Sequence, residues 1–303
     1  MSKIVVVGSI SMDLVMRTKR IPEGGETIFG DSFNIVPGGK GANQAVAIGR
    51  LSSVEDNIYI FGNVGEDIFS ADLLSNLQNN DISTAYVGTV PQSTGVAQIT
   101  LYGGDNRIIY YPGANNLVKT NDWKNEWELI SDASIVVLQN EIPHEANLSI
   151  AKFCQENQVK VLYNPAPARE TDKEMIPFCD FITPNEHECS ELFPDKKLDE
   201  IIKIYPNKMI VTLGVEGSIY YDGTAVKKIP AIKAEVVDTT GAGDTFNGAF
   251  AYAISKGKEM DIALSFATIA SHLSVQRFGA QGGMPSLKEI KEHSGYEEIW
   301  DFK

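Results

Sequence analysis

The stretch that decides the fold lies late in the chain and reads Val237-Asp238-Thr239-Thr240-Gly241-Ala242-Gly243-Asp244-Thr245-Phe246. It leads into a run of small and apolar residues, 246–253, which predicts a buried helix. Two glycines around one alanine let the backbone bend tightly where that helix begins, and unpaired N–H groups at a helix start favour an anion. The sequence therefore predicts an anion hole formed by the backbone of Gly241, Ala242 and Gly243.

An aspartate, Asp244, directly follows this glycine turn. A carboxylate beside an anion hole has a chemical use when it takes a proton from an attacking hydroxyl. Phosphoryl transfer to an alcohol needs that pairing of a base with fixed dipoles. The alternative is structural: Asp244 stabilises the first helical turn, and the glycines serve only the bend. Taken alone, this stretch leaves both interpretations open, because short glycine-rich matches also occur by chance.

The composition limits the classes of partner. The chain has 303 residues and 43% hydrophobic content, which is enough for one large core. Its net charge of −14 argues against nucleic acid or an anionic membrane surface, since both need basic patches. Three cysteines without C-x-x-C spacing predict free thiols in a reducing compartment, and no apolar run has membrane length. Because the N-terminus enters a strand pattern directly, we expect a cytoplasmic protein.

Strand-like and helix-like segments alternate through most of the chain. Runs typical of buried strands occur at 4–7, 58–61, 135–138, 159–163, 181–183 and 209–213. Segments expected to be helical lie at 44–51, 70–78, 145–156, 198–204, 260–275 and 287–293. This alternation predicts a single α/β domain over residues 1–303, with a central, mainly parallel sheet flanked by helices. Residues 217–229 predict a hairpin at the edge of that sheet.

Two other stretches break this alternation, residues 13–36 and 95–111. Apolar and polar side chains alternate in both, and a period of two predicts half-exposed antiparallel strands. The second stretch has glycines at 103 and 104, which indicate a hairpin turn. Strands supplied by separate parts of the chain predict a small β-sheet appendage that is placed to act as a lid.

A second glycine-rich loop, Gly38-Gly39-Lys40-Gly41-Ala42-Asn43, precedes the first predicted helix. It is not a P-loop, because Asn34 stands where the first glycine would be and Gly41 follows Lys40. The chain also lacks G-x-G-x-x-G, which disfavours a dehydrogenase. Such a loop allows close approach to a polar ligand, with a lysine for charge and an asparagine amide for hydrogen bonds. A helix N-terminal turn with a solvated lysine remains the alternative for the loop alone.

Taken in order, these motifs resemble those of the ribokinase family, among the phosphofructokinase-B-type sugar kinases. The two glycine loops carry the resemblance, and 184–188 adds the family's N-x-x-E element. The similarity covers essentially the whole chain, from Gly8-Ser9-Ile10-Ser11-Met12-Asp13 to Gly279-Ala280-Gln281. The resemblance implies a ribokinase-like fold with a small β-sheet lid, and an enzyme that transfers phosphate from ATP to a sugar hydroxyl.

The resemblance also implies a role for each matching residue. Asp244 is the general base that takes the proton from the sugar's primary hydroxyl as it attacks the γ-phosphate of ATP. The implied sugar contacts are Ser11, Asp13, Gly38, Gly39, Lys40, Asn43, Glu141 and Asp244. The implied nucleotide contacts are Asn185, Thr212, Gly214, Gly217, Gly243 and Thr268, the last at a position where the family often has asparagine or histidine.

Two metal ions are implied in the same way. Glu188 organises Mg²⁺ through the waters of its hydration shell. An activating monovalent cation, usually K⁺, is bound by residues on both sides of the anion-hole loop. Its implied ligands are Asp238 and Thr240, with backbone carbonyls near Ser274, Arg277, Gly279 and Gly283. Helix capping is the alternative role for Asp238.

The substrate implied by the resemblance is D-ribose, phosphorylated at O5 to D-ribose 5-phosphate. One departure bears on it: the family commonly has Asn-x-Asp where this chain has Ser11-Met12-Asp13. A kinase of the same fold for 2-deoxyribose, a ketohexose or a nucleoside such as adenosine is the alternative, because fold does not fix substrate. A non-catalytic sugar-binding protein is disfavoured, since it has no need of a base. We also expect a homodimer formed through the lid, with 96–101 as the exposed edge strand.

Overall fold

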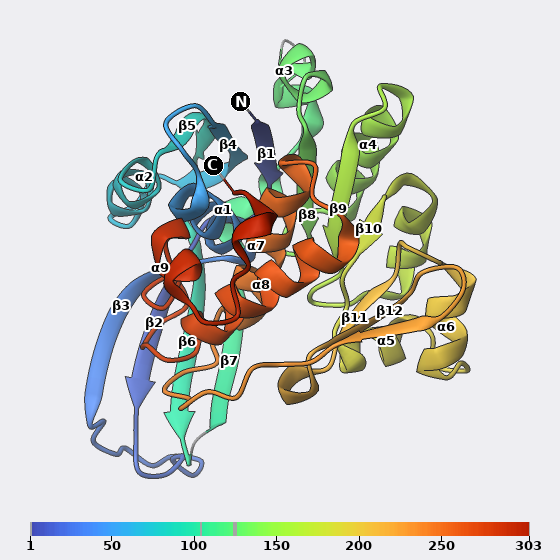
Figure 1. Cartoon of the computed structure of the whole chain (residues 1–303). Helices are drawn as coiled ribbons and strands as arrows, with labels where there is room; N and C mark the ends of the chain where they lie inside the picture. The colour runs from blue at the N-terminus through green and yellow to red at the C-terminus, as the bar shows by residue number, and fades with distance from the viewer. Residues whose placement is uncertain (1, 104, 124–125, 303) are drawn as a thin grey trace.

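A computed structural model describes residues 2–103, 105–123 and 126–302 of the chain (Figure 1). Its centre is a six-stranded sheet in which every neighbouring pair is parallel. The strands, in spatial order, are β10 (Phe181–Ile182), β9 (Lys160–Asn164), β8 (Ile135–Gln139), β1 (Lys3–Val7), β4 (Asn57–Gly65) and β5 (Ile82–Val90). The prediction of a mainly parallel central sheet is confirmed.

Helices cover both faces of this sheet. Alternate residues of β1 point to opposite sides, so Ile4 and Val6 join one buried cluster while Val5 and Val7 join the other. The first cluster is covered by α1 (Lys40–Leu51), α2 (Ser70–Gln78), α7 (Ala242–Ser255), α8 (Met260–Ser274) and α9 (Leu287–Glu292). The second is covered by α3 (Trp127–Ser131), α4 (His144–Glu156), α5 (Glu186–Leu192) and α6 (Leu198–Ile204). A sheet buried on both faces explains why its strands read as continuous apolar runs.

A three-stranded antiparallel sheet adjoins the β10 end of the central sheet. It consists of β11 (Ile210–Thr212), β12 (Ser218–Tyr221) and β13 (Val226–Ile229). Isolated parallel bridges, Ile182 to Met209 and Asn185 to Thr212, join it to the end of the central sheet. The predicted hairpin at 217–229 is therefore present. Sequence reasoning missed α3, β5 and α5.

A separate four-stranded sheet projects from one end of the molecule (Figure 1). Its order is β3 (Ser32–Gly38), β2 (Ser11–Arg17), β6 (Gly95–Tyr102) and β7 (Asp105–Tyr111). The prediction that 96–101 forms an exposed edge was wrong, because β6 pairs with β2 on one side and β7 on the other. Alternation in the sequence reflects a half-exposed face, which an interior strand also has. The outer strands of this sheet are β3 and β7.

Helices α1 and α7 pack closely together behind the central sheet. The contact depends on Gly248 of α7, where a Cβ atom would lie 2.6 Å from the Ala47 Cβ and 2.8 Å from the Gln44 carbonyl oxygen. Both helices begin at the carboxyl ends of the strands, and each is preceded by one of the two glycine-rich loops. Their close packing therefore brings the two loops together.

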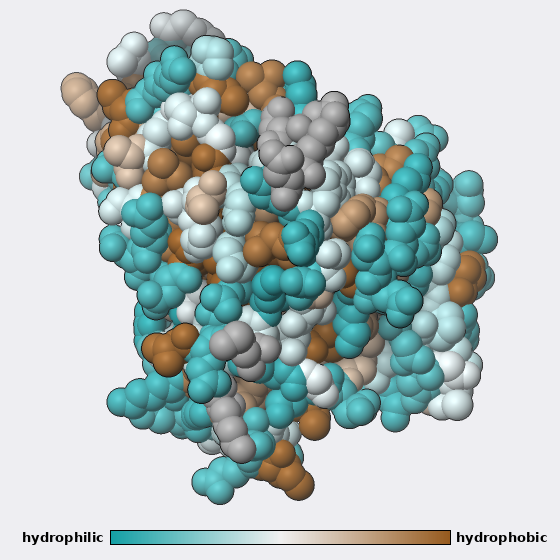
Figure 2. All heavy atoms as spheres, turned by 90° about the horizontal axis from the view of Figure 1, so that it is seen from above, coloured by the Kyte–Doolittle hydropathy of each residue, from teal (hydrophilic) through white to brown (hydrophobic). Residues whose placement is uncertain are grey.

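The face at the amino ends of the central strands, opposite the two glycine-rich loops, has hydrophilic residues that separate small hydrophobic patches (Figure 2). Within the described ranges, no helix is both long enough and apolar enough to cross a membrane. The three cysteines, Cys154, Cys179 and Cys189, are buried and unpaired.

Candidate active site

Asp244 lies in the first turn of α7, and its two carboxylate oxygens accept hydrogen bonds from residues of α1. Asn43 Nδ2 donates to Oδ2 at 2.9 Å, and Gln44 Nε2 donates to Oδ1 at 3.1 Å. The side chain is only 6% exposed. The two glycine-rich loops, about 200 residues apart in the sequence, therefore meet at one carboxylate, as the sequence interpretation required.

Other buried amides continue this contact, and sequence reasoning missed them. Gln139 Nε2 donates to Gln44 Oε1 at 2.8 Å. On the other side, Gln281 Nε2 donates to Asn43 Oδ1 at 2.9 Å. The only signal in the sequence was the place of Gln281 at the end of the family resemblance. An amide in an apolar neighbourhood needs partners, but the sequence does not say which residues they are.

The predicted anion hole lies at the start of α7. Gly241 is the N-cap residue with φ 77°, a left-handed conformation that favours glycine, and Gly243 is exposed with open space around its Cα. Within the described residues, the N–H groups of Gly241 and Gly243 have no protein acceptor, whereas Ala242 N–H donates to the Thr239 carbonyl at 3.2 Å. Two of the three predicted N–H groups are thus free for an anion, and that of Ala242 is engaged in the turn.

Acidic side chains surround the first glycine loop. In β2, Asp13 is buried against Gly38, where a Cβ atom would lie 2.3 Å from the Asp13 carboxylate. Glu141 follows β8, and its Oε2 accepts from Ser9 Oγ at 2.6 Å and from Lys40 N–H at 2.9 Å. The structure thus brings the predicted sugar contacts of the loop, β2 and the end of β8 together in one cluster of polar groups.

The charges in this pocket shift one another's pKa values. Burial raises the pKa of Asp13 to about 7, and the nearby carboxylates of Glu141 and Asp244 add to that rise. Burial also raises the pKa of Glu141, against the lowering effect of the Lys40 ammonium. For Lys40, burial lowers the pKa, but Asp244, Glu141 and Glu188 outweigh burial and raise it. One ammonium is therefore balanced against several carboxylates, as in many catalytic sites.

Ser11, the residue that departs from the family pattern, is the first residue of β2 in the four-stranded sheet. Its hydroxyl lies 3.3 Å from the hydroxyl of Tyr110 in β7 and accepts from Asn115 Nδ2 at 3.0 Å. Asn115 Oδ1 accepts from Ile10 N–H, and its Nδ2 donates to Tyr110 Oη, so this buried amide ties the connection between β1 and β2 to β7. Gly39, the N-cap residue of α1, lies beside Ser11, since a Cβ atom there would be 2.8 Å from Ser11 N.

Four of the predicted nucleotide contacts, Asn185, Thr212, Gly214 and Gly217, lie where the three-stranded sheet joins the end of the central sheet. Asn185 and Glu188 form a reciprocal cap on α5, in which each backbone N–H donates to the other side chain at 2.8 Å. Thr212 ends β11 and is bridged to Asn185, and Gly214 follows in a left-handed conformation. Gly217 turns into β12, where any Cβ would collide with the Ile229 carbonyl. The Thr268 hydroxyl donates to Leu264 O of its own helix.

The residues expected around a monovalent cation also lie close together. Asp238 Oδ1 accepts from Thr240 N–H and Oδ2 from Gly279 N–H, both at 2.9 Å. Gly283 lies against the Ser274 carbonyl and donates its N–H to the Gly279 carbonyl at 3.1 Å. The Arg277 side chain turns away to pair with Glu289. Asp238 is the single carboxylate of this set and the carbonyl oxygens are neutral, which suits a cation of low charge.

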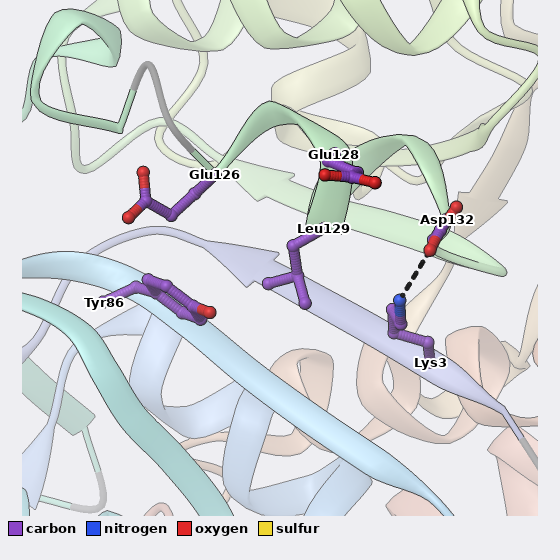
Figure 3. A pocket seen from close by; sticks show the side chains of 6 residues that line it. All are labelled: Lys3, Tyr86, Glu126, Glu128, Leu129 and Asp132. Carbon is purple, nitrogen blue, oxygen red and sulfur yellow. Dashed lines mark hydrogen bonds and ion pairs between the residues drawn. The ribbon is translucent and has the colours of Figure 1, made fainter.

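A surface hollow at the other end of the central sheet is not part of this site. It is lined by Lys3, Tyr86, Glu126, Glu128, Leu129 and Asp132 (Figure 3). Lys3 begins β1, so the hollow lies at the amino ends of the strands. Ligands of open α/β sheets bind at the carboxyl ends, where Asp244 and Glu141 lie.

The sequence profile of the "pfkB family carbohydrate kinase" matches residues 1–287. The chain belongs to the pfkB family of carbohydrate kinases. It is 61% identical over 291 residues to a ribokinase of Lactococcus lactis, covering 96% of each chain, and 44% identical over 293 residues to a ribokinase of Bacillus subtilis, covering 96% of this chain and 99% of the other. A deoxyribokinase of Salmonella typhi is 34% identical over 307 residues, covering 97% and 99%.

Among solved structures, an Arabidopsis thaliana ribokinase complexed with ribose and ATP matches with a TM-score of 0.85 at 32% identity, over all of both chains. A ribokinase of Thermotoga maritima matches with a TM-score of 0.86 at 36% identity, covering 96% of this chain and 98% of the other. The ribokinase-like fold expected from the sequence is confirmed.

Proposed function

We propose that the chain is an ATP-dependent ribokinase that converts D-ribose to D-ribose 5-phosphate. The observation that carries the proposal is the contact between Asn43 and Asp244, because it brings the polar loop and the candidate base together. The names of the relatives at 61% and 44% identity support ribose as the sugar. The many polar groups of the pocket suit a small polyol better than a large apolar ring.

In this mechanism Asp244 acts as the general base. The sugar hydroxyl donates to one carboxylate oxygen while Asn43 and Gln44 hold the carboxylate in place. As the hydroxyl oxygen attacks the γ-phosphorus of ATP, its proton passes to Asp244 and the bond to the β,γ-bridging oxygen breaks. The free N–H groups of Gly241 and Gly243 stabilise the charge on the transferred group. Asp13, Lys40 and Glu141 bind the remaining sugar hydroxyls.

The nucleotide and its ions belong to the same proposal. ATP occupies the side of the site lined by Asn185, Thr212 and Gly214, where strands of both sheets end. Glu188 would hold Mg²⁺ through water, and the ion would neutralise phosphate charge; one carboxylate fits an ion that keeps most of its hydration shell. A K⁺ ion at Asp238 would brace the anion-hole loop, since that carboxylate already binds both Thr240 and Gly279.

The four-stranded sheet is proposed to act as a lid. A cavity of about 460 Å³ separates its Arg17 and Tyr102 end from Val236–Thr239, so this end of the sheet is not packed on the main body. Its exposed apolar side chains, among them Phe33, Ile35 and Ile109, support pairing of two lids in a homodimer. The molar mass in solution tests this pairing. A cytoplasmic location, supported by three unpaired thiols, completes the proposal.

The test is a substrate panel. Purified protein is incubated with Mg-ATP and ribose, 2-deoxyribose, fructose or adenosine, with and without K⁺, and ADP release is followed. Turnover of ribose well ahead of the others supports the proposal. Preference for deoxyribose is the second candidate, because a Salmonella deoxyribokinase is also related and Ser11 replaces the usual asparagine. Preference for deoxyribose would change the proposed substrate but not the proposed phosphoryl transfer from ATP.

The variant Asp244→Asn tests the mechanism. Asparagine keeps the shape of the side chain but cannot accept a proton from the sugar, so we expect kcat to fall by about 10²–10⁴-fold. ATP binding, measured by calorimetry, and the melting temperature should stay near those of the wild type. Unchanged turnover would show that Asp244 is not the base.

A further inference from the structure

The Asn43 amide that contacts Asp244 has a defined orientation. An ionised carboxylate only accepts hydrogen bonds, so Asn43 must turn its Nδ2 toward Asp244 and leave Oδ1 facing away. Gln281 Nε2 donates to that Oδ1 at 2.9 Å, and Asn76 Nδ2 donates to Gln281 Oε1 at 2.7 Å. Three amides thus stand in a line that begins in α2 and ends at the base, and each donates toward Asp244.

Gln281, the middle amide of this line, is held in place by Arg50. Gln281 lies in the segment after α8 and is 5% exposed. Arg50 Nη1 donates to the carbonyls of Gln281 at 2.6 Å and Met284 at 2.8 Å. Arg50 Nε also donates to Asn80 Oδ1, and Asn80 Nδ2 donates to the Asn76 carbonyl. Arg50 therefore fixes the backbone at Gln281 directly and at Asn76 through Asn80. The side-chain amides of Gln281 and Asn76 can then change little except by flipping, which exchanges the positions of the amide oxygen and nitrogen.

We propose that Gln281 and Asn76 are positioning residues that fix the direction of the Asn43 amide and, through it, the orientation of the base. The inference rests on the proposed function, since it takes Asp244 as the base. If Gln281 turned its carbonyl toward Asn43, Asn43 would have to turn as well. Its Oδ1 would then face an Asp244 oxygen, and two buried acceptors would repel each other. The direction of the line, as well as its presence, therefore affects catalysis.

The decisive comparison is between Asn76→Asp and Asn76→Ala. Aspartate has the size of asparagine but, when ionised, only accepts, so it draws Gln281 Nε2 toward residue 76 and reverses the line. Alanine removes the partner and leaves Gln281 free to keep its native direction. We expect Asn76→Asp to lower kcat about tenfold and Asn76→Ala to lower it less, with the KM for ATP unchanged in both.

A purely structural role for Asn76 predicts the opposite order, because deleting the side chain loses every contact. The inference is overturned if Asn76→Ala is at least as slow as Asn76→Asp, or if both turn over like the wild type.

A second variant, Gln281→Leu, tests the middle of the line. It removes the donor to Asn43 and should also lower kcat by about tenfold or more. Its matched control is Gln276→Leu, five residues earlier, because Gln276 is exposed and, among the residues that the structure describes, its side chain bonds only to His272. The control should keep wild-type kcat. If Gln281→Leu does not fold, the two Asn76 variants still decide the question.

Wild type and Asp244→Asn are assayed in the same series with ribose and Mg-ATP. A wild type that phosphorylates no sugar, or an Asp244→Asn variant with full turnover, overturns the proposed function and the inference with it. If both behave as proposed while Asn76→Asp and Gln281→Leu keep wild-type kcat, only the inference is overturned.

Discussion

The two ends of the central sheet both place a lysine near acidic side chains, yet in different surroundings. At the carboxyl ends, Lys40 is balanced against Glu141 and the buried Asp244, and both carboxylates accept hydrogen bonds from the protein. At the amino ends, Lys3 pairs with Asp132 at 3.2 Å, but the two side chains are 26% and 65% exposed (Figure 3). Burying charges is costly unless they are paired, and sites that retain such charges are commonly catalytic.

The comparison teaches that the burial and hydrogen bonding of the carboxylates, more than the types of residue, separate a functional charge cluster from an ordinary surface ion pair. The same substitution, lysine to methionine, can be made at each end. It keeps most of the length of the side chain and removes the ammonium group with its charge and N–H donors.

The largest effect is expected from Lys40→Met. Without the ammonium, Glu141 and Asp244 lose their nearby positive charge, and the pKa of Glu141, which Lys40 lowers, should rise further. Loss of one electrostatic contact in a catalytic site costs about 10²–10³-fold in rate. We expect a fall of that size in kcat/KM for ribose, measured by ADP release. A fall in kcat/KM of less than about threefold would show that the Lys40 ammonium does not contribute to the electrostatics of the site.

A medium effect is expected from Asp13→Asn, and it depends on pH. The pKa of Asp13 is raised from 3.8 to about 7 by burial and by Glu141 and Asp244. The folded protein therefore holds this proton more tightly than the unfolded chain does. The stability that this proton contributes is complete below about pH 4 and is lost as the pH rises through 7.

Thermal melts of the unliganded protein at pH 5 and pH 8 check this prediction. Asparagine does not ionise, so Asp13→Asn should gain melting temperature relative to the wild type at pH 8 and gain less at pH 5. An equal difference at both pH values would contradict the raised pKa.

The smallest effect is expected from Lys3→Met. Exposed ion pairs contribute at most about 1 kcal/mol, so urea unfolding should show a loss within that limit. Turnover should be unchanged, because the pair lies at the end of the sheet away from Asp244. A large loss of turnover in Lys3→Met would contradict the conclusion that only the charges at the carboxyl ends of the sheet are functional.

The strands of the central sheet were predictable because burial on both faces leaves continuous apolar runs such as Ile4–Val7. The sequence did not indicate β5, whose serine, threonine and glycine residues dilute that signal. The pairing of β6 was also hidden, since alternation describes the faces of a strand and says nothing of its neighbours. Asn185 and Glu188 were assigned to the nucleotide, but the structure also gives them a capping role that the N-x-x-E spacing allows.

The candidate base and its glycine turn were predictable because a helix start requires small residues and local N–H groups, which are close in sequence. The amides behind the base were not. Gln281 meets Asn43 across 238 residues, and Asn76 meets Gln281 across 205. Nothing local distinguishes a glutamine in such a line from a glutamine on the surface, so only the folded arrangement identifies it.

The missing side chain at Gly248 controls the distance between the two glycine-rich loops. Because α1 and α7 touch there, the loops at their N-termini lie close enough for Asn43 to reach Asp244. A methyl group at this position would act as a wedge and move the loops apart at some expense in stability. Redesign toward bulkier alcohols can therefore start at this helix contact, without changing any residue that touches the sugar.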